Sequence, residues 1–135
     1  MSGSIQRAGR YLLDTNAAIA VLNDKLDLER RLDGSRDVFL NATVVGELCY
    51  GAEKSSRVEA NLVKVRRLIV VCPVFVCDEE TARHYASIQN FLRRKGHPIP
   101  QNDIWVAASA RQHRLILVTR DGHFDDVDDL ITETW

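Results

Sequence analysis

Residues 10–23 read RYLLDTNAAIAVLN, a short apolar run that ends at an acid and passes directly into a helix-forming stretch. The run Arg10–Leu13 is predicted to be a strand, and the Ala- and Leu-rich stretch Thr15–Asn23 to be a helix. Asp14 stands between them. The carboxyl ends of the strands in an open parallel α/β sheet border the crevice where ligands bind, so this acid is expected at a binding site.

Three further acids occupy comparable places in the sequence. Glu47 lies in a short helical stretch after the predicted strand Val38–Leu40, Asp103 opens an apolar helix, and Asp121 follows the apolar run Leu115–Val118. Four carboxylates in one crevice raise one another's pKa, because like charges repel at short range. A hard divalent cation such as Mg²⁺ or Mn²⁺ relieves that repulsion. The four acids therefore predict metal-dependent chemistry on phosphate.

Each acid also has a purely structural interpretation. Asp14 could cap the following helix, since Asp is a favoured N-cap residue. Asp103 could be a first-turn acid favoured by the helix dipole. Glu47 could lie on a solvated helix face, and Asp121 opens an acidic tract that is otherwise interpreted as a solvated loop. The joint pattern is more specific than any one member.

Strand-like and helix-like stretches alternate along the rest of the chain. This alternation predicts right-handed βαβ crossovers, and so a three-layer α/β fold with a central parallel sheet flanked by helices. The stretch Ile69–Val76 is predicted to be a strand near a sheet edge, because Pro73 cannot donate to a central ladder. The remaining predicted elements are helices at Leu26–Leu32, Thr43–Ala52, Val58–Leu68, Glu79–Lys95 and Asp103–His113, and a final strand at Leu130–Thr132.

The composition is that of an ordinary globular protein. Its 135 residues predict a single domain over 1–135, with residues 1–9 as a short, disordered lead. Hydrophobic residues make up 45% and charged residues 27% of the chain, and no apolar run approaches the roughly 20 residues of a membrane span. Three cysteines without a C-x-x-C pair favour reduced thiols and a cytoplasmic location.

The distribution of charge is compatible with a nucleic-acid substrate. The formal net charge is −1, but the 18 basic residues outnumber the acids once the four candidate ligands are set aside. Most of these bases are Arg, the better planar partner for phosphate. Candidate RNA contacts are Arg120, and Arg93 and Arg94, which could equally complement the dipole at a helix end. His123 is interpreted as a loop histidine, with contact to substrate as the alternative.

Four segments resemble the motifs of PIN-domain ribonucleases, and among those most closely the VapC toxins of bacterial toxin–antitoxin pairs. They stand in family order and at family spacing, and the resemblance runs from Tyr11 almost to the end of the sequence. The segments are Leu12–Asn16 (LLDTN), Val45–Gly51 (VGELCYG), Pro98–Ala108 (PIPQNDIWVAA) and Leu117–Asp121 (LVTRD).

The resemblance implies a sheet of five strands and the four acids as catalytic ligands of Mg²⁺ or Mn²⁺. It implies Asn16 and Thr119 as polar support for those ligands, and Thr15 is expected to act with them, since hydroxyl and amide groups orient metal ligands. It also implies an endoribonuclease toxin that cleaves tRNA, rRNA or mRNA to leave a 5′-phosphate and a 3′-hydroxyl. The implied partners are a VapB-like antitoxin, a second toxin copy, and operator DNA bound through the antitoxin.

Two other functions would use a similar architecture. A phosphatase of the haloacid-dehalogenase type also places an Asp after its first strand, but it expects a second Asp where Asn16 stands and a later catalytic Lys. A phospho-receiver domain could use Asp78 as phosphoacceptor, but it needs an acidic pair near the first strand and a late Lys. The sequence has no Lys after Lys95, so both alternatives are weaker.

Overall fold

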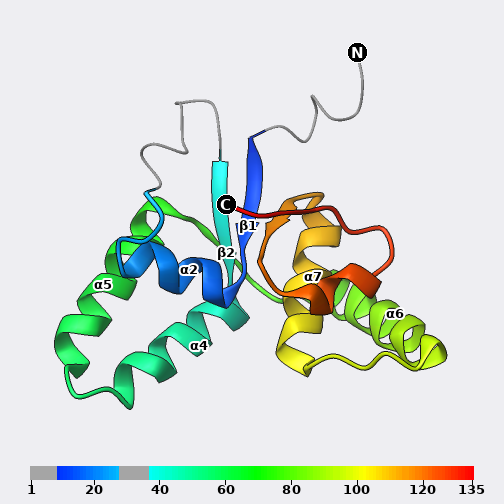
Figure 1. The fold of residues 1–135 in the computed structure, drawn as a ribbon, viewed down its shortest axis with the longest axis horizontal. Helices are drawn as coiled ribbons and strands as arrows, with labels where there is room; N and C mark the ends of the chain where they lie inside the picture. The colour runs from blue at the N-terminus through cyan, green and yellow to red at the C-terminus, as the bar shows by residue number, and fades with distance from the viewer. Residues whose placement is uncertain (1–8, 28–36) are drawn as a thin grey trace.

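A computed structural model describes residues 9–27 and 37–135 of the protein. A five-stranded parallel sheet has the order β3-β2-β1-β4-β5, and helices lie on both of its faces. In Figure 1, α2, α4 and α5 lie to one side of β1 and β2, and α6 and α7 to the other. The strands are β1 (Arg10–Leu13), β2 (Asp37–Asn41), β3 (Val74–Phe75), β4 (Ile116–Val118) and β5 (Thr132–Glu133). The helices are α2 (Thr15–Leu22), α4 (Ala42–Glu53), α5 (Val58–Val71), α6 (Glu79–Lys95), α7 (Gln101–His113) and the 3₁₀ helix η1 (Gly122–Asp126). The predicted three-layer fold is confirmed.

The central strand is β1, which is why its sequence is almost wholly apolar. Leu12 lies opposite Phe39 of β2 on one side and Leu117 of β4 on the other. Leu12, Leu13 and Leu117 are fully buried. A strand covered by helices on both faces reads as a continuous hydrophobic run rather than as an alternating one.

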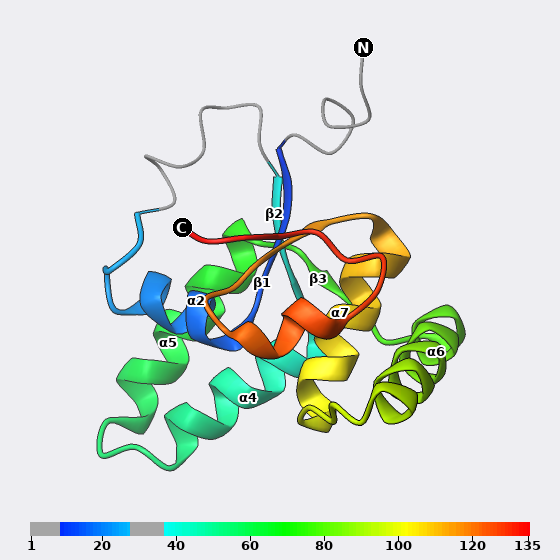
Figure 2. The same cartoon turned by 45° about the vertical axis from the view of Figure 1, so that its right-hand side comes forward.

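The predicted strand Ile69–Val76 is wrong in its first half. The helix α5 continues to Val71, and only Val74 and Phe75 form the strand β3. Val65, Leu68 and Cys72 are buried at helical spacing, so the core-facing stripe of α5 extends into the β-branched stretch and outweighs its strand propensity. The predicted edge position is confirmed, because β3 pairs with β2 alone at one end of the sheet, as the turned view also shows (Figure 2).

The last predicted strand is shifted along the sequence. The strand β5 covers Thr132–Glu133 rather than Leu130–Thr132. Leu117 donates its backbone N–H to the carbonyl of Ile131, and Thr119 donates to that of Glu133. Leu130 packs against the hydrophobic core and is not part of the sheet.

The tract after β4 is not the plain solvated loop that its acids predict. Gly122–Asp126 form η1, in which Phe124 is buried, and Val127 directly after it is buried as well. These two apolar side chains anchor the turn to the core, so its backbone has a defined position beside the end of β4.

Two other predictions lie partly or wholly outside the described residues. Of the predicted helix Leu26–Leu32, Leu26 and Asp27 are not helical, and the remainder falls in the range 28–36 that is not described. The expected lead over residues 1–9 likewise falls outside it, except for Gly9, which is buried and accepts a hydrogen bond from the backbone N–H of Asp37. Among the described residues, no helix is both long and apolar enough to cross a membrane.

Candidate metal centre

Asp14 lies at the junction of the central strand and the first helix. Its side chain is only 5% exposed, and its Oδ1 accepts a 2.7 Å hydrogen bond from the backbone N–H of Ala17. Its own backbone N–H donates to the carbonyl of Val118 in the neighbouring β4. Asp14 is therefore the N-cap of α2, as the structural interpretation expects. A carboxylate has about four acceptor positions, so capping leaves it able to bind a cation as well.

Glu47 is held from a different helix. The hydroxyl of Thr15, the first residue of α2, donates a 2.6 Å hydrogen bond to Oε1 of Glu47 in α4. Glu47 is half-buried. Thr15 therefore contacts a candidate ligand directly.

The helix that carries Glu47 is fixed to the helix that carries Asp103. Asn41, fully buried at the end of β2, caps α4 by accepting a 2.9 Å hydrogen bond from Val44 N–H. Its amide nitrogen donates to Ser109 Oγ at 3.1 Å and to the Trp105 carbonyl at 3.3 Å in α7. One buried amide thus sets the spacing of two candidate ligand helices, which the sequence motifs do not reveal.

Asp103 and Asp121 meet at the imidazole of His123. The Nδ1 atom of His123 lies 3.3 Å from Oδ2 of Asp103 and 3.1 Å from Oδ2 of Asp121. Asp103 is in the first turn of α7, and Asp121 caps η1 by accepting a 2.9 Å hydrogen bond from His123 N–H. The ligand atoms of these three side chains all lie within 4.8 Å of one another, which is close enough for one ion to bridge them.

Burial and mutual repulsion act on the two most enclosed acids. Burial is the main reason that the pKa of Asp14 lies above its ordinary value of 3.8, and the charges of Asp121 and Glu47 raise this pKa further. Interactions with Thr119 and with the backbone N–H of Ala17 lower the pKa and offset part of the increase. Burial also raises the pKa of Asp103, and the charges of Asp121 and Glu47 add to the effect, while His123 opposes it. The charges of Asp121 and Glu47 thus act on both enclosed acids, while the group of ligand atoms within 4.8 Å of one another contains Asp103, Asp121 and His123 and not Asp14 or Glu47.

The supporting residues differ in how closely they approach the acids. Thr119 is buried, its side chain lowers the pKa of Asp14, and it accepts a 2.9 Å hydrogen bond from the backbone N–H of Asp121. It therefore relates two candidate ligands directly. Asn16 is exposed and lines a cavity of about 190 Å³ together with Thr119 and Arg120.

The basic residues predicted to contact RNA lie outside the acid cluster. Arg120 is exposed and donates to the carbonyl oxygen of Trp135. Arg93 and Arg94 are exposed in the last turn of α6, and Arg93 donates to Asn90 Oδ1 at 2.8 Å. The structure thus places these side chains on the surface near helix and strand ends.

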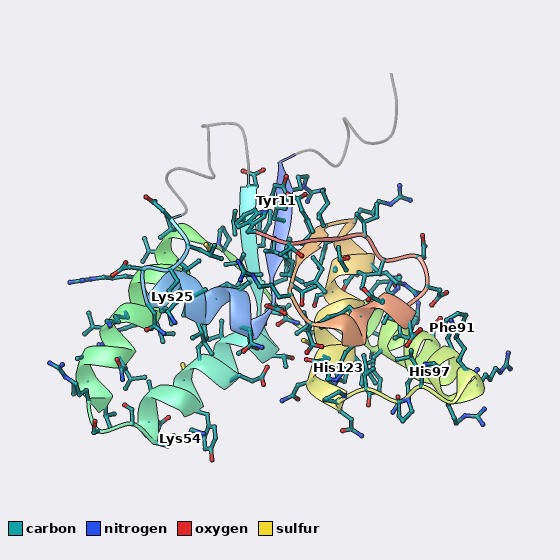
Figure 3. All side chains as sticks on the ribbon, viewed as in Figure 1. Tyr11, Lys25, Lys54, Phe91, His97 and His123 are labelled. Atoms are coloured by element: carbon teal, nitrogen blue, oxygen red, sulfur yellow. The ribbon has the colours of Figure 1, made fainter. Side chains whose placement is uncertain are left out.

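His123 is the residue that sequence reasoning missed. The sequence favours a loop histidine, with contact to substrate as the alternative, and does not predict contact with two candidate ligands. In Figure 3 His123 is labelled beside α7, whereas His97 is labelled beside α6. The signal that could have identified it is its spacing, two residues after Asp121 and directly before the apolar Phe124, which anchors the turn.

Comparison with known proteins identifies the family. The PIN domain model matches residues 11–130. Ribonuclease VapC2 of Haemophilus influenzae is 33% identical over 129 residues, which cover 93% of this chain and 98% of the relative. The chain belongs to the VapC family of PIN domains. The tRNA(fMet)-specific endonuclease VapC of Shigella flexneri is 32% identical, with the same coverage.

Solved structures of VapC proteins share the fold of this PIN domain. The DNA-bound VapBC of Salmonella typhimurium superposes with a TM-score of 0.86 at 32% identity, covering 93% of this chain and 98% of that chain. VapBC2 of Rickettsia felis, bound to a DNA fragment of its promoter, gives the same TM-score at 26% identity. Both structures contain a toxin and an antitoxin. The five-stranded parallel sheet implied by the family resemblance is confirmed.

The donor set of this VapC-family site fits a divalent cation. Its four carboxylates supply hard oxygen donors, and the raised pKa values of Asp14 and Asp103 mean that unneutralised negative charge is disfavoured there. A bound cation would reverse that penalty, because it favours the ionised form of each carboxylate.

Proposed function

We propose that this protein is a metal-dependent endoribonuclease toxin that cleaves RNA needed for translation and is neutralised by a VapB-type antitoxin. Two observations support the proposal: ligand atoms of Asp103 and Asp121 lie within 4.8 Å of each other, and the charges of Asp121 and Glu47 act on Asp14 at the end of β1. The names of the relatives, ribonuclease and tRNA-specific endonuclease, support it. The RNA target is a tRNA, an rRNA or an mRNA.

The four acids would hold Mg²⁺ or Mn²⁺, which when bound lowers the pKa of water and neutralises charge on the scissile phosphate. The protein's part is to hold the carboxylates in place. Asp14 is rigid because it caps α2 inside the core, Thr15 orients Glu47, and Thr119 relates Asp14 to Asp121. Groups that contact a metal ligand without binding the metal themselves hold that ligand in the orientation needed for binding. The expected products carry a 5′-phosphate and a 3′-hydroxyl.

The surface around the acids would bind the RNA backbone. Arg120 stands beside Asp121 in the sequence and is exposed. Arg93 and Arg94, in the last turn of α6, come shortly before Asp103 along the chain. An exposed guanidinium forms charge-assisted, bidentate hydrogen bonds with phosphate oxygens. These three side chains are the proposed phosphate contacts.

The two alternative functions have less support in the structure. Asp78, the phosphoacceptor that a receiver domain would need, caps α6 in a capping box with Thr81 and accepts a 3.0 Å hydrogen bond from Gln112. Those hydrogen bonds lower its pKa. The phosphatase alternative needs an acid where Asn16 stands. Neither arrangement matches the observed cluster.

An antitoxin could inhibit the site by supplying a cation of its own. An apolar groove of about 250 Å³ runs between α2, α4 and α5 and reaches Glu47; its apolar lining is Ile19, Leu22, Leu48, Ala52 and Val65. A C-terminal antitoxin segment lying there could place an Arg or Lys among the acids, because guanidinium pairs strongly with carboxylate. The resulting complex would include a toxin homodimer and would contact operator DNA through the antitoxin.

The proposal is tested by incubating the purified protein with total RNA in the presence of Mg²⁺, Mn²⁺ or EDTA. Discrete cleavage products should form with a divalent cation and disappear with EDTA, and mapping of the RNA ends should show 5′-phosphates. Asp14→Asn and Asp103→Asn should each abolish cleavage while the protein remains folded. Cleavage that persists in EDTA, or in either variant, would refute the metal-dependent mechanism.

A further inference from the structure

We propose that His123 is a fifth ligand of this metal centre, and that its imidazole Nδ1 makes the site favour Mn²⁺ over Mg²⁺. The inference rests on the proposed function, since it concerns the same site. It goes beyond the acid motif, because neither the family pattern of four carboxylates nor the relatives' names assign a role to a histidine here.

Donor atoms of Asp103, Asp121 and His123 all lie within 4.8 Å of one another, close enough to be ligands of a single ion. His123 Nδ1 lies 3.1 Å from Asp121 Oδ2 and 3.3 Å from Asp103 Oδ2. Adjacent donors around an octahedral ion, at ligand distances of about 2.1 Å, lie about 3 Å apart. An ion placed between these side chains would need little rearrangement of them.

The backbone of His123 is held in place by its neighbours. Its N–H donates a 2.9 Å hydrogen bond to Oδ1 of Asp121, and the adjacent Phe124 is buried in the core. The imidazole is thus attached to an anchored turn whose cap is itself a candidate ligand. The His123 side chain remains 51% exposed, so an ion can reach it from solvent.

The chemistry of the imidazole distinguishes between the two candidate ions. Mg²⁺ prefers oxygen ligands and gives up its waters reluctantly. Imidazole nitrogen suits first-row transition ions better, and Mn²⁺ also accepts carboxylates. Carboxylates alone would suit both ions, so the nitrogen donor is the feature that shifts the preference toward Mn²⁺.

A second histidine offers a matched control. His97 Nδ1 lies 3.0 Å from Oδ2 of Asp126, so this pair has the same atoms at a similar distance. His97 faces one carboxylate, whereas His123 faces two. Comparison of His97→Gln with His123→Gln should therefore separate the effect of removing any histidine from the effect of removing a metal ligand.

The experiment measures Mn²⁺ and Mg²⁺ binding to the full chain by calorimetry, together with electron spin echo envelope modulation of bound Mn²⁺. We expect ¹⁴N modulation from an imidazole in the wild type and in His97→Gln, and its loss in His123→Gln. The Mn²⁺ affinity of His123→Gln should fall roughly tenfold or more, the loss typical of a disturbed ligand shell, while Mg²⁺ affinity changes little. Circular dichroism of each variant checks the fold.

The outcomes separate this inference from the proposed function. Bound Mn²⁺ that supports RNA cleavage but shows no ¹⁴N modulation would overturn the ligand assignment alone. Modulation that persists in His123→Gln would do the same. A wild-type protein that binds neither ion, and cleaves no RNA with either, would overturn both proposals.

Discussion

The hydroxyl of Thr15 donates a 2.6 Å hydrogen bond to Oε1 of Glu47, joining two helices through residues 32 positions apart in the sequence. The hydrogen bond makes the position of Glu47 depend on Thr15. Thr15 is the residue that directly follows Asp14, a second candidate ligand. The geometry of the acids is therefore a property of the α2–α4 contact as well as of each helix.

Replacing Thr15 by Val keeps the shape of the side chain but removes the donor. Metal affinity should fall by roughly 10–100-fold, the usual effect of losing a group that orients a ligand, and Thr15→Ser should restore most of it. Isothermal titration with Mn²⁺ measures both. Unchanged affinity in Thr15→Val would mean that Glu47 keeps its position without this hydrogen bond.

Asp14→Asn should leave the metal-free protein as stable as the wild type or slightly more stable. Asn caps helices about as well as Asp, and the change removes a charge that burial and neighbouring acids disfavour. Asp14→Ala, which removes the cap, should lose about 0.5–2 kcal/mol of unfolding free energy. Chemical denaturation compares the two variants, and a large loss in Asp14→Asn would contradict the conclusion that burial and the neighbouring acids disfavour this charge.

The stability of the metal-free protein should fall as the pH rises through the acidic range. The folded-state pKa values of Asp14 and Asp103 lie above their ordinary value of 3.8, so in that window the folded state binds more protons than the unfolded state. The contribution is greatest below pH 3.8 and is lost as the pH passes the raised values. Denaturation of wild type and Asp103→Asn across this range should give a shallower slope for the variant; equal slopes would contradict the assignment.

Asp121→Asn should reduce cleavage far more than Asp125→Asn. Asp121 lies beside His123 and Thr119 in the cluster, whereas Asp125 is exposed on η1. The loss for Asp121 should exceed the roughly 10–100-fold typical of residues that only support a ligand, and Asp125→Asn should be close to wild type. Single-turnover cleavage rates decide the matter, and similar losses in both would place the fourth ligand elsewhere.

Ile19→Asp should weaken the antitoxin complex while RNA cleavage by the free toxin is retained. Ile19 is 41% exposed and lines the apolar groove. Ile131, 43% exposed and outside that groove, provides the matched control, Ile131→Asp. Co-purification with the cognate VapB-type antitoxin should fail for the first variant only. Equal retention by both would exclude the groove as the binding surface.

The positions of the acids could be anticipated because they depend on a general property of parallel sheets. Asp14 directly follows β1, Asp121 comes shortly after the neighbouring strand β4, and the ends of such strands meet at one edge. The helix α6 was also predicted with its observed bounds, since its amphipathic stripe and its stop at Gly96 are local signals. Strand ends and helix boundaries of this kind can be predicted from neighbouring residues in the sequence, without knowledge of tertiary contacts.

The features that were missed depend on tertiary contacts. The helix α5 continues to Val71 because Cys72 is buried in the core. The strand propensity of the β-branched residues does not take this burial into account. The 3₁₀ turn η1 exists because Phe124 finds a place in the core. The position of His123 between two carboxylates follows from that turn. Asn41 likewise links α4 to α7 through hydrogen bonds to residues more than sixty positions away.

The pairing of β1 with β4 has a consequence for synthesis of the protein. Leu13, directly before Asp14, pairs with Val118, roughly 100 residues later in the chain. Contacts of such long range form late, because a large loop must close first. A growing chain on the ribosome therefore presents Asp14 long before Asp121 has been added, and its acids remain separate. An enzyme directed against translation would in this way stay inert toward the ribosome that is making it.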